Sequence, residues 1–282
     1  MNSKGIIANS FPKSGTHILT QILFLLGYTQ ADTHLSRSLL VYGSRNIIRN
    51  IKVHGRIEKR SNNGLLIDIE NKDRAVKENW FISHVNNKLT SGKYSQGHLP
   101  YSEKLDEMLL CNDVKMLYIH RNPLDVLVSL KNYILKKKNY PNHKMLVECK
   151  NDSERFLLLI NGNNEGDNRT LMAPFFEKYK MSKRWVECDL ICSVKFEKII
   201  GSKGGGNSND QKAELLKIIK YLGENERDIE QIQHNIYNPK SDTFHKGIIG
   251  QWRKEIPIKI LDICNQKLED ANLSVDEYIA TT

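Results

Sequence analysis

Long hydrophobic runs, paired cysteines and aromatic clusters are all missing from this chain of 282 residues. No stretch approaches the roughly 20 apolar residues that a membrane-spanning helix needs, so we expect no membrane span. The 5 cysteines form no Cys-x-x-Cys pair, and their irregular spacing predicts free thiols rather than disulfides or a zinc site. Aromatic residues make up 8% of the sequence and are dispersed, which disfavours a nucleic-acid-binding surface of interleaved basic and aromatic side chains.

A signal-peptide pattern is missing too, because Lys4 is followed by a short apolar segment and then by polar residues. Together with the free thiols, this predicts a soluble, cytoplasmic protein. The net charge of +9 favours acidic partners, among them nucleotides and phosphorylated or sulfated molecules. We interpret the triplet Lys136, Lys137 and Lys138 as the solvated end of a helix, where cations suit the helix dipole, and not as a nucleic-acid patch.

Strand and helix patterns alternate along the chain, which has the length of one α/β domain. The strands are expected at residues 5–9, 65–69, 114–119 and 190–196, and the helices at residues 16–26, 105–110, 123–134, 153–160, 174–186 and 212–222. This alternation predicts a parallel sheet with right-handed crossovers. Residues 201–209 contain three consecutive glycines and are expected to form a flexible linker.

The turn after the first strand, Pro12-Lys13-Ser14-Gly15-Thr16, is the most informative segment. A strand, a glycine-containing turn and a helix direct backbone N–H groups and a helix N-terminus to one point, an arrangement that binds phosphate or sulfate. This is not a Walker A loop, because the lysine precedes the glycine and no glycine opens the loop. On this motif alone, an ordinary strand-to-helix turn explains the residues equally well.

Two later segments also suit an anion. Arg121 follows a predicted strand, at the edge where open α/β sheets bind ligands, and Ser129 lies two helical turns further on. Gly247 and Gly250 stand among basic residues, in a loop whose backbone can wrap closely around an anion. From these residues alone, three alternatives stay open. Arg121 forms a structural ion pair, Ser129 is a hydroxyl on a helix surface, and the loop with the two glycines is a plain basic turn.

Taken together, the motifs resemble those of the sulfotransferases that use 3′-phosphoadenosine 5′-phosphosulfate (PAPS), in particular the soluble cytosolic and bacterial type. The resemblance spans residues 7–253 and rests on five segments in family order: Pro12-Lys13-Ser14-Gly15-Thr16, Gly97-His98-Leu99-Pro100, Arg121-Asn122-Pro123-x-Asp125-Val126-x-Val128-Ser129, Val194-Lys195-Phe196-Glu197, and Lys246-Gly247-x-x-Gly250-x-Trp252. It implies a P-loop NTPase-like fold, with a central parallel sheet covered by helices on both faces, in a single sulfotransferase domain over residues 1–282.

The resemblance assigns roles to residues of these segments. It implies that Lys13 neutralises the bridging oxygen, that His98 is the general base and that Ser129 acts with Arg121 on the 3′-phosphate. The implied cofactor-binding residues are Pro12, Lys13, Ser14, Gly15, Thr16, His17, Arg121, Ser129, Phe196, His245, Lys246 and Gly247. PAPS is then the co-substrate, no metal is required, and the partner is a small-molecule acceptor with a hydroxyl or amine.

The chain departs from the family pattern at several of its positions. His17 stands for a threonine, Ile18 for the tryptophan that stacks on adenine, Gln96 for a basic residue, His245 for an arginine and Gln251 for an aspartate. A catalytically impaired relative that binds PAPS or its product, and an atypical P-loop nucleotide kinase, are therefore kept as alternatives.

The sequence leaves two questions open, namely the oligomeric state and the identity of the acceptor. The dimerisation segment of animal members is not recognisable near residues 256–260, so monomer and homodimer both remain. We expect residues 30–95 and 139–172 to form the acceptor pocket, but they carry no readable code for the acceptor.

Overall fold

The computed structural model describes residues 5–31, 34–35, 65–69, 72–76, 78–140, 142–163, 172–225, 229–237 and 247–273. Its strands are β1 Gly5–Ser10, β2 Thr29–Gln30, β3 Leu65–Ile69, β4 Lys72–Val76, β5 Lys93–Gly97, β6 Val114–His120 and β7 Cys192–Lys195. Its helices are α1 Thr16–Leu25, α4 Glu78–Lys88, α5 Glu103–Cys111, α6 Pro123–Lys136, α7 His143–Glu148, α8 Asp152–Asn161, α9 Phe175–Lys183, α10 Phe196–Ile199, α11 Ser208–Leu222, α12 Ile229–Asn235, α13 Trp252–Glu255 and α14 Ile258–Asp270. Over these ranges, every helix is too short or too polar to cross a bilayer.

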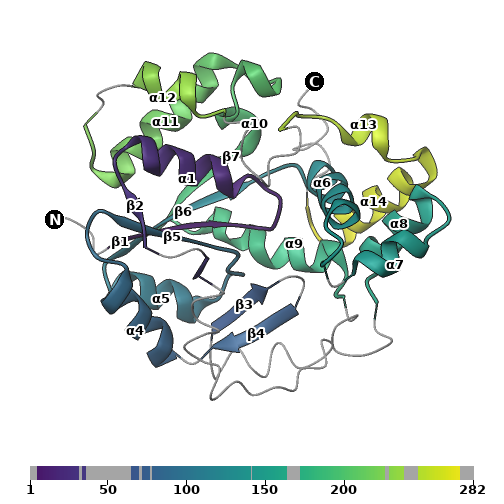
Figure 1. Cartoon of the computed structure of the whole chain (residues 1–282), viewed down its shortest axis with the longest axis horizontal. Helices are drawn as coiled ribbons and strands as arrows, with labels where there is room; N and C mark the ends of the chain where they lie inside the picture. Colours follow the sequence, from purple (N-terminus) through teal and green to yellow (C-terminus); the bar gives the residue numbers. More distant parts are fainter. Residues whose placement is uncertain are drawn as a thin grey trace.

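A five-stranded parallel sheet in the order β2-β5-β1-β6-β7 forms the centre of the fold (Figure 1). β1 lies in the middle, with β5 on one side and β6 on the other, and its last residue Ser10 pairs with Ile119. The predicted parallel α/β architecture is confirmed. Strand β3 was also predicted, but it pairs with β4 in a separate antiparallel ribbon rather than with the central sheet.

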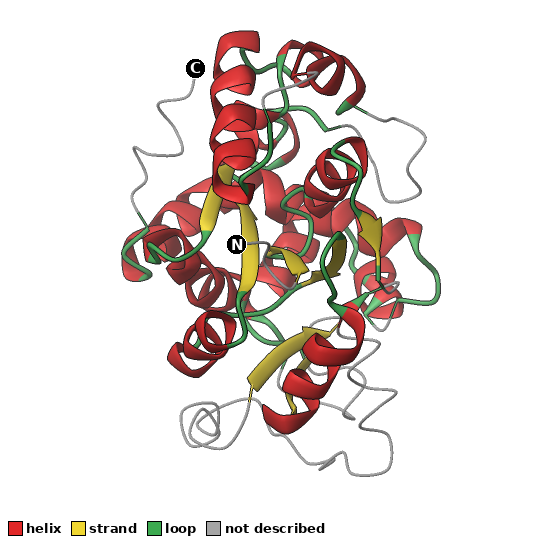
Figure 2. Cartoon of the chain, turned by 90° about the vertical axis from the view of Figure 1, so that its left-hand side faces the viewer, coloured by secondary structure: helices red, strands yellow, loops and turns green. Residues whose placement is uncertain are grey.

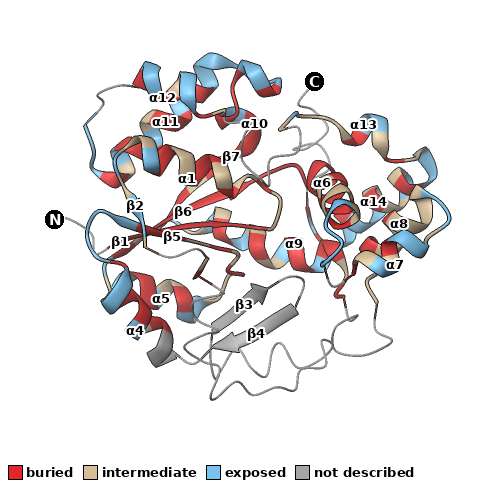
Figure 3. Ribbon diagram, viewed as in Figure 1, coloured by how far each residue is buried: buried red, intermediate tan, exposed pale blue. Residues whose placement is uncertain are grey.

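Side chains alternate along the strands, so they pack into two apolar layers, one on each face of the central sheet. Ile6 and Ala8 of β1 pack with α1, α10, α11 and α12 on one face, while Ile7 packs with α4 and α5 on the other. All residues of β1 are buried, and the strands of the central sheet run between helices in both views of the chain (Figures 2 and 3). Helices on both faces explain why these strands read as apolar runs.

A third apolar cluster lies beyond the carboxyl end of β1, where Phe11 continues the strand. It joins α6, α8, α9, α13 and α14 around the rings of Phe11, Phe156, Phe175 and Tyr179. The helical layer therefore meets the sheet at the edge where the strands end. That edge carries the motifs singled out in the sequence.

Two local predictions were wrong. The expected linker at residues 201–209 is instead a compact 3₁₀ turn, Ser202–Gly204, followed by α11, whose N-cap Asn207 accepts hydrogen bonds from the N–H groups of Asn209 and Asp210. A Cβ at Gly204 would come within 2.6 Å of the Gly247 carbonyl oxygen. These glycines therefore permit close packing rather than flexibility. The last predicted strand ends at Lys195, because Phe196 already begins α10.

Candidate functional site

The turn after β1 is tightly constrained. The Ser14 N–H donates to the Phe11 carbonyl at 3.1 Å, and the chain then enters α1 through Gly15, which has a φ of 109°. A Cβ at Gly15 would lie 2.7 Å from Phe196 Cδ2. Both the backbone conformation and the space therefore require glycine here. Pro12 and His17, also predicted for this site, lie half-buried in and just after the turn.

Hydroxyl groups line this turn at the N-terminus of α1. The Thr16 and Ser10 hydroxyls share a hydrogen bond of 2.5 Å. Ser14 is fully buried, and its hydroxyl has no hydrogen-bond partner among the described residues. Leaving a buried hydroxyl unpaired costs about 1–3 kcal/mol, so its retention next to a helix N-terminus fits an anion that would pair with it.

Lys13 lies at the mouth of the same turn. Its Nζ is 4.1 Å from the centre of the Tyr133 ring on α6, a cation–π contact. Burial lowers the pKa of Lys13 to about 8, with further lowering by the charges of Arg121, Lys137 and Lys136. An anion bound beside Lys13 would offset both effects, because it favours the charged ammonium.

His98 is held against the end of β1 by backbone and side-chain groups. Its Nδ1 lies 3.0 Å from the Ser10 carbonyl oxygen, which can only accept, so Nδ1 carries the proton and Nε2 is the basic nitrogen. The Asn9 side chain accepts from the Leu99 N–H at 2.7 Å and donates to the Leu99 carbonyl at 2.9 Å. Asn9 and Ser10 thus position His98 beside the anion turn, a role that the sequence motifs did not reveal.

Two further histidines surround His98. The His34 ring centre is 5.0 Å from that of His98. Burial lowers the pKa of His17 to about 4, with smaller contributions from Lys13 and His98. His17 is therefore neutral at pH 7 and adds no positive charge to the anion turn.

We expect Asn9→Leu to lower the free energy of unfolding by about 1–3 kcal/mol, because it leaves the buried Leu99 N–H unpaired, whereas the Leu99 carbonyl keeps its hydrogen bond from Trp185 Nε1. Urea unfolding measures this change. The matched control is Asn87→Leu, whose side chain makes an exposed hydrogen bond within α4 and should shift stability by less than about 0.5 kcal/mol. Equal stability of the two variants would contradict a clamping role for Asn9.

Arg121 follows β6 and lies against the anion turn. Its guanidinium carbon is 4.1 Å from the centre of the Phe196 ring, the same ring that packs on Gly15. Its Nη2 donates to the Ile248 carbonyl at 2.9 Å and lies 3.7 Å from Asp125 Oδ2. Its Nε is buried and has no hydrogen-bond partner within the described ranges. The sequence-predicted Gly15, Phe196 and Arg121 are thus brought together.

Asp125 joins the C-terminal loop to the start of α6. Its carboxylate accepts from the Gly250 N–H at 2.8 Å and from the Trp252 N–H at 3.1 Å. Gly247 belongs to this loop, whereas His245 and Lys246 lie outside the described residues. Asp125 was part of the motif but not of the predicted site, and its position four residues after Arg121 was the signal that could have identified it.

Helix α6 begins at this site because Asn122 caps it and Pro123 occupies its first turn. Ser129, the remaining predicted site residue, is half-buried one turn beyond Asp125 on the same helix. Ile18 is buried in the core of the sheet, so it offers no surface on which a base could stack.

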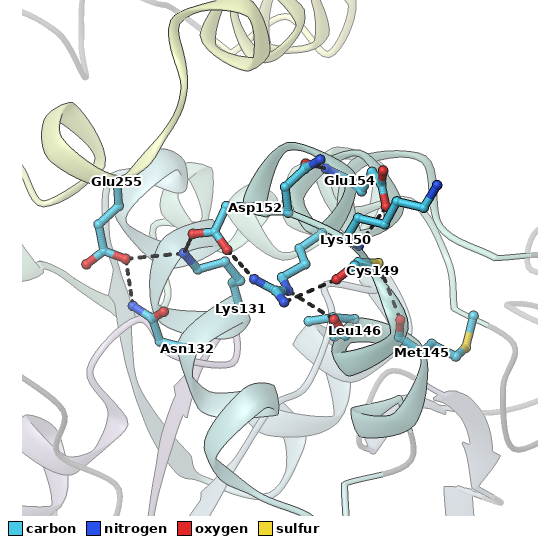
Figure 4. Close-up of polar contacts among 11 residues, drawn as sticks. Lys131, Asn132, Met145, Leu146, Cys149, Lys150, Asp152, Glu154 and Glu255 are labelled. Atoms are coloured by element: carbon cyan, nitrogen blue, oxygen red, sulfur yellow. Dashed lines mark hydrogen bonds and ion pairs between the residues drawn. The ribbon is translucent and has the colours of Figure 1, made fainter.

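A network of charged groups fixes α6 to two other helices (Figure 4). Lys131 Nζ lies 2.7 Å from Asp152 of α8 and 3.4 Å from Glu255 of α13. Asn132 also donates to Glu255, and Arg155 holds the second oxygen of Asp152. Because α13 follows directly on the C-terminal loop, this network keeps the loop and α6 in one arrangement.

The described residues contain no group of three or more histidine, cysteine, aspartate or glutamate side chains that could hold a metal ion. All five cysteines are free. Of the residues expected to form the acceptor pocket, 30–95 and 139–172, the stretches 36–64 and 164–171 lie outside the described ranges.

Comparisons with known proteins identify the family and the fold of the chain. The family model described as a sulfotransferase domain matches residues 4–271. A search of curated proteins finds no match. Among solved structures, the chain is similar to mouse sulfotransferase SULT7A1 complexed with PAP, at 16% identity and a TM-score of 0.57, covering 99% of this chain and 85% of that one.

The chain is also similar to two structures of retinol dehydratase. The complex with androsterone and the inactive cofactor PAP gives 15% identity and a TM-score of 0.53, covering 95% of this chain and 80% of that one. The complex with retinol and PAP gives 15% identity and a TM-score of 0.51, covering 96% and 82%. At these identities the likeness shows a shared fold.

Proposed function

The chain belongs to the sulfotransferase domain family, and from this premise we propose that it transfers a sulfuryl group from PAPS to a hydroxyl or amine of a small-molecule acceptor. The product on the donor side is then adenosine 3′,5′-bisphosphate (PAP). The structures of SULT7A1 and retinol dehydratase, which share the fold, are both complexes with PAP, in keeping with this donor.

The observation that carries the proposal is a pair of buried polar atoms, at the ends of neighbouring strands, that have no hydrogen-bond partner among the described residues. Ser14 Oγ follows β1, and Arg121 Nε follows β6. Phe196 lies between them and contacts both the anion turn and the guanidinium. A hydroxyl and a guanidinium N–H that lack partners, at the ends of two neighbouring strands, suit a nucleotide with separate 5′- and 3′-phosphates, and the residues therefore fit PAPS.

In this proposal the backbone N–H groups of Ser14, Gly15 and Thr16 bind the 5′-phosphate, and Arg121 with Ser129 binds the 3′-phosphate. Gly247 and the rest of the C-terminal loop cover that end, with Lys246 and His245 adding positive charge. PAPS, when bound, supplies an activated sulfuryl group on a phosphate leaving group.

The chain's own catalytic groups then have two tasks. His98 accepts the acceptor's proton at Nε2, since its Nδ1 proton is held by the Ser10 carbonyl. The Lys13 ammonium stabilises negative charge at the mouth of the turn, where charge develops as the bond to the leaving group breaks. Catalysis of this kind depends on positioning and electrostatics, so it requires no metal in this proposal.

The experiment is to compare two nucleotides on Arg121→Ala. The variant should bind PAP about 10- to 100-fold more weakly, because a hydrogen bond to a charged group is worth about 1.5–3 kcal/mol. Adenosine 5′-phosphosulfate lacks the 3′-phosphate, so its affinity should change little. Calorimetry measures both.

The matched control is Arg184→Ala, which replaces an exposed arginine directly after the C-terminal end of α9 and should bind both ligands as the wild type does. Arg121→Lys, which keeps a cation beside Asp125, should recover part of the PAP affinity if the alanine variant folds poorly. Equal losses of both ligands in Arg121→Ala would reject the assignment of the 3′-phosphate to Arg121.

A further inference from the structure

Three consecutive lysines close helix α6 next to the proposed site. Lys136 is the last residue of α6, Lys137 caps it, and all three lysines are exposed. Lys136 and Lys137 lie three and four residues after Tyr133, so they share the face of the helix that bears this ring. Tyr133 is the residue whose ring contacts the Lys13 ammonium, at 4.1 Å. The lysine triplet therefore lies one helical turn beyond Lys13.

The end of α6 is well held in place. The Lys137 N–H donates to the Tyr133 carbonyl at 3.0 Å, and the Tyr140 N–H donates to the Lys137 carbonyl at 2.8 Å. The Tyr140 ring packs edge-on against Tyr133, with 5.6 Å between ring centres. The His143 ring also donates to the Ile134 carbonyl. The lysines thus lie next to two packed tyrosine rings, in a segment whose backbone is held by hydrogen bonds.

No carboxylate of the described residues lies within ion-pair distance of these three lysines. Neighbouring lysines, in contrast, do form ion pairs: Lys131 on the same helix pairs with two carboxylates, and Lys144 on α7 pairs with Glu148. Figure 4 shows the first of these arrangements. Within the described ranges, the positive charge at the end of α6 is therefore available to pair with an external anion.

The charges of two of these lysines affect Lys13 in the proposed site. Lys137 and Lys136 contribute, after burial and Arg121, to the lowered pKa of Lys13. Like charges placed close together repel one another, and an anion bound beside these lysines would reduce that repulsion.

The helix also indicates which ligand the lysines face. Arg121, the proposed 3′-phosphate residue, lies just before the start of α6, and Lys136 ends the helix about 20 Å away at 1.5 Å per residue. Lys13, beside Tyr133, lies between them. A nucleotide that reaches from Arg121 to Lys13 places its sulfuryl end toward the triplet, and the next molecule in that direction is the acceptor.

We propose that Lys136, Lys137 and Lys138 select acceptors that carry a carboxylate or sulfate beside the hydroxyl or amine to be sulfated. This inference rests on the proposed function and names the chemical class of its acceptor. The lysines are specificity-determining residues in it, outside the groups that act on the reacting atoms.

The test measures acceptor binding to the PAP-saturated protein by calorimetry, with two matched pairs of probes. One pair is 4-hydroxyphenylacetate and its neutral amide; the other is an oligosaccharide of uronic acids and the neutral oligosaccharide of equal length. The wild type should bind the acidic member of at least one pair at least about tenfold more tightly. The variant Lys136→Gln/Lys137→Gln/Lys138→Gln should lose this preference, since three exposed ion pairs together amount to about tenfold.

The matched control is Lys212→Gln/Lys217→Gln/Lys220→Gln, which removes the same charge from α11, away from α6 (Figure 1). It should keep the preference, and the preference of the wild type should shrink as salt is raised. No preference for either acid in the wild type, or equal loss in both triple variants, would overturn the inference.

The affinity for PAP separates this inference from the proposed function. If the wild type and the α6 variant bind PAP equally, and only the wild type prefers the acidic probes, the acceptor inference and the proposed function are both supported. If the α6 variant loses PAP affinity as strongly as probe affinity, the lysines serve the nucleotide and the acceptor inference fails. If the wild type does not bind PAP at all, the proposed function itself fails.

Discussion

His98→Gln is expected to lower turnover by about 10²–10⁴-fold while leaving the fold and the affinity for PAP unchanged. The reason is geometric: Nδ1 of His98 is committed to the Ser10 carbonyl, which leaves Nε2 to take the acceptor's proton. Glutamine keeps the size and a hydrogen-bonding end but accepts no proton. Initial rates with an aliphatic alcohol acceptor and calorimetry with PAP measure the two quantities separately.

The matched control for this variant is His234→Gln, an exposed histidine on α12, which should retain full turnover. The loss in His98→Gln should be smaller for a phenol, since a phenolic proton needs less help to leave. Near-full activity of His98→Gln on the aliphatic alcohol would contradict the assignment. His17 would then be the next residue to test, because it follows the anion turn directly.

Lys13→Ala is expected to lower turnover by about 10²–10³-fold, which is the usual effect of removing one group that stabilises developing charge. The affinity for the intact donor PAPS should fall much less, because the interaction strengthens only as the leaving group gains charge. Steady-state rates and calorimetry with PAPS in the absence of an acceptor give the two numbers. A variant with wild-type turnover and only a raised KM for the donor would contradict this role.

Proton uptake gives an independent measure of the same lysine. Burial lowers the pKa of Lys13 to about 8 in the free protein, so at pH 8.5 a large part of it is neutral. A bound anion favours the charged ammonium and raises this pKa, so PAP binding at pH 8.5 should take up protons. Calorimetry in buffers of different ionisation enthalpy counts them. The uptake should vanish in Lys13→Ala and persist in Lys212→Ala, an exposed control on α11.

The parts of the fold that the sequence predicted well are those where local patterns and tertiary environment agree. β1 and β6 are largely apolar because helices cover both faces of the sheet, and α6 has its Asn122 cap and Pro123 in place. The motifs lie where these strands end, so the anion turn, Arg121 and Phe196 could be expected to meet at one edge.

The missed elements have physical reasons. β5 lies next to the central strand, yet its sequence Lys93-Tyr94-Ser95-Gln96-Gly97 is polar, so its place in the sheet comes from pairing with β1 and β2. α14 could have been found, because Ile260, Cys264 and Leu268 follow a helical spacing and are buried.

The positioning of His98 could not be predicted from local sequence. Its support comes from Asn9 and Ser10, which lie about 90 positions earlier and become neighbours only through the pairing of β1 with β5. The same holds for Asp125 and the C-terminal loop, which are 125 residues apart at the Gly250 contact.

Thermal unfolding with and without ligand tests the central claim most directly, namely that the site at the ends of β1 and β6 binds the 3′,5′-nucleotide of PAPS. A ligand that binds only the folded state must stabilise it, by about 2.7 kcal/mol at 100 times its Kd. PAP should therefore raise the Tm by about 5–10 °C in the absence of metal, while ATP with magnesium and duplex DNA should leave it nearly unchanged. Stabilisation by ATP with magnesium but not by PAP would contradict the account.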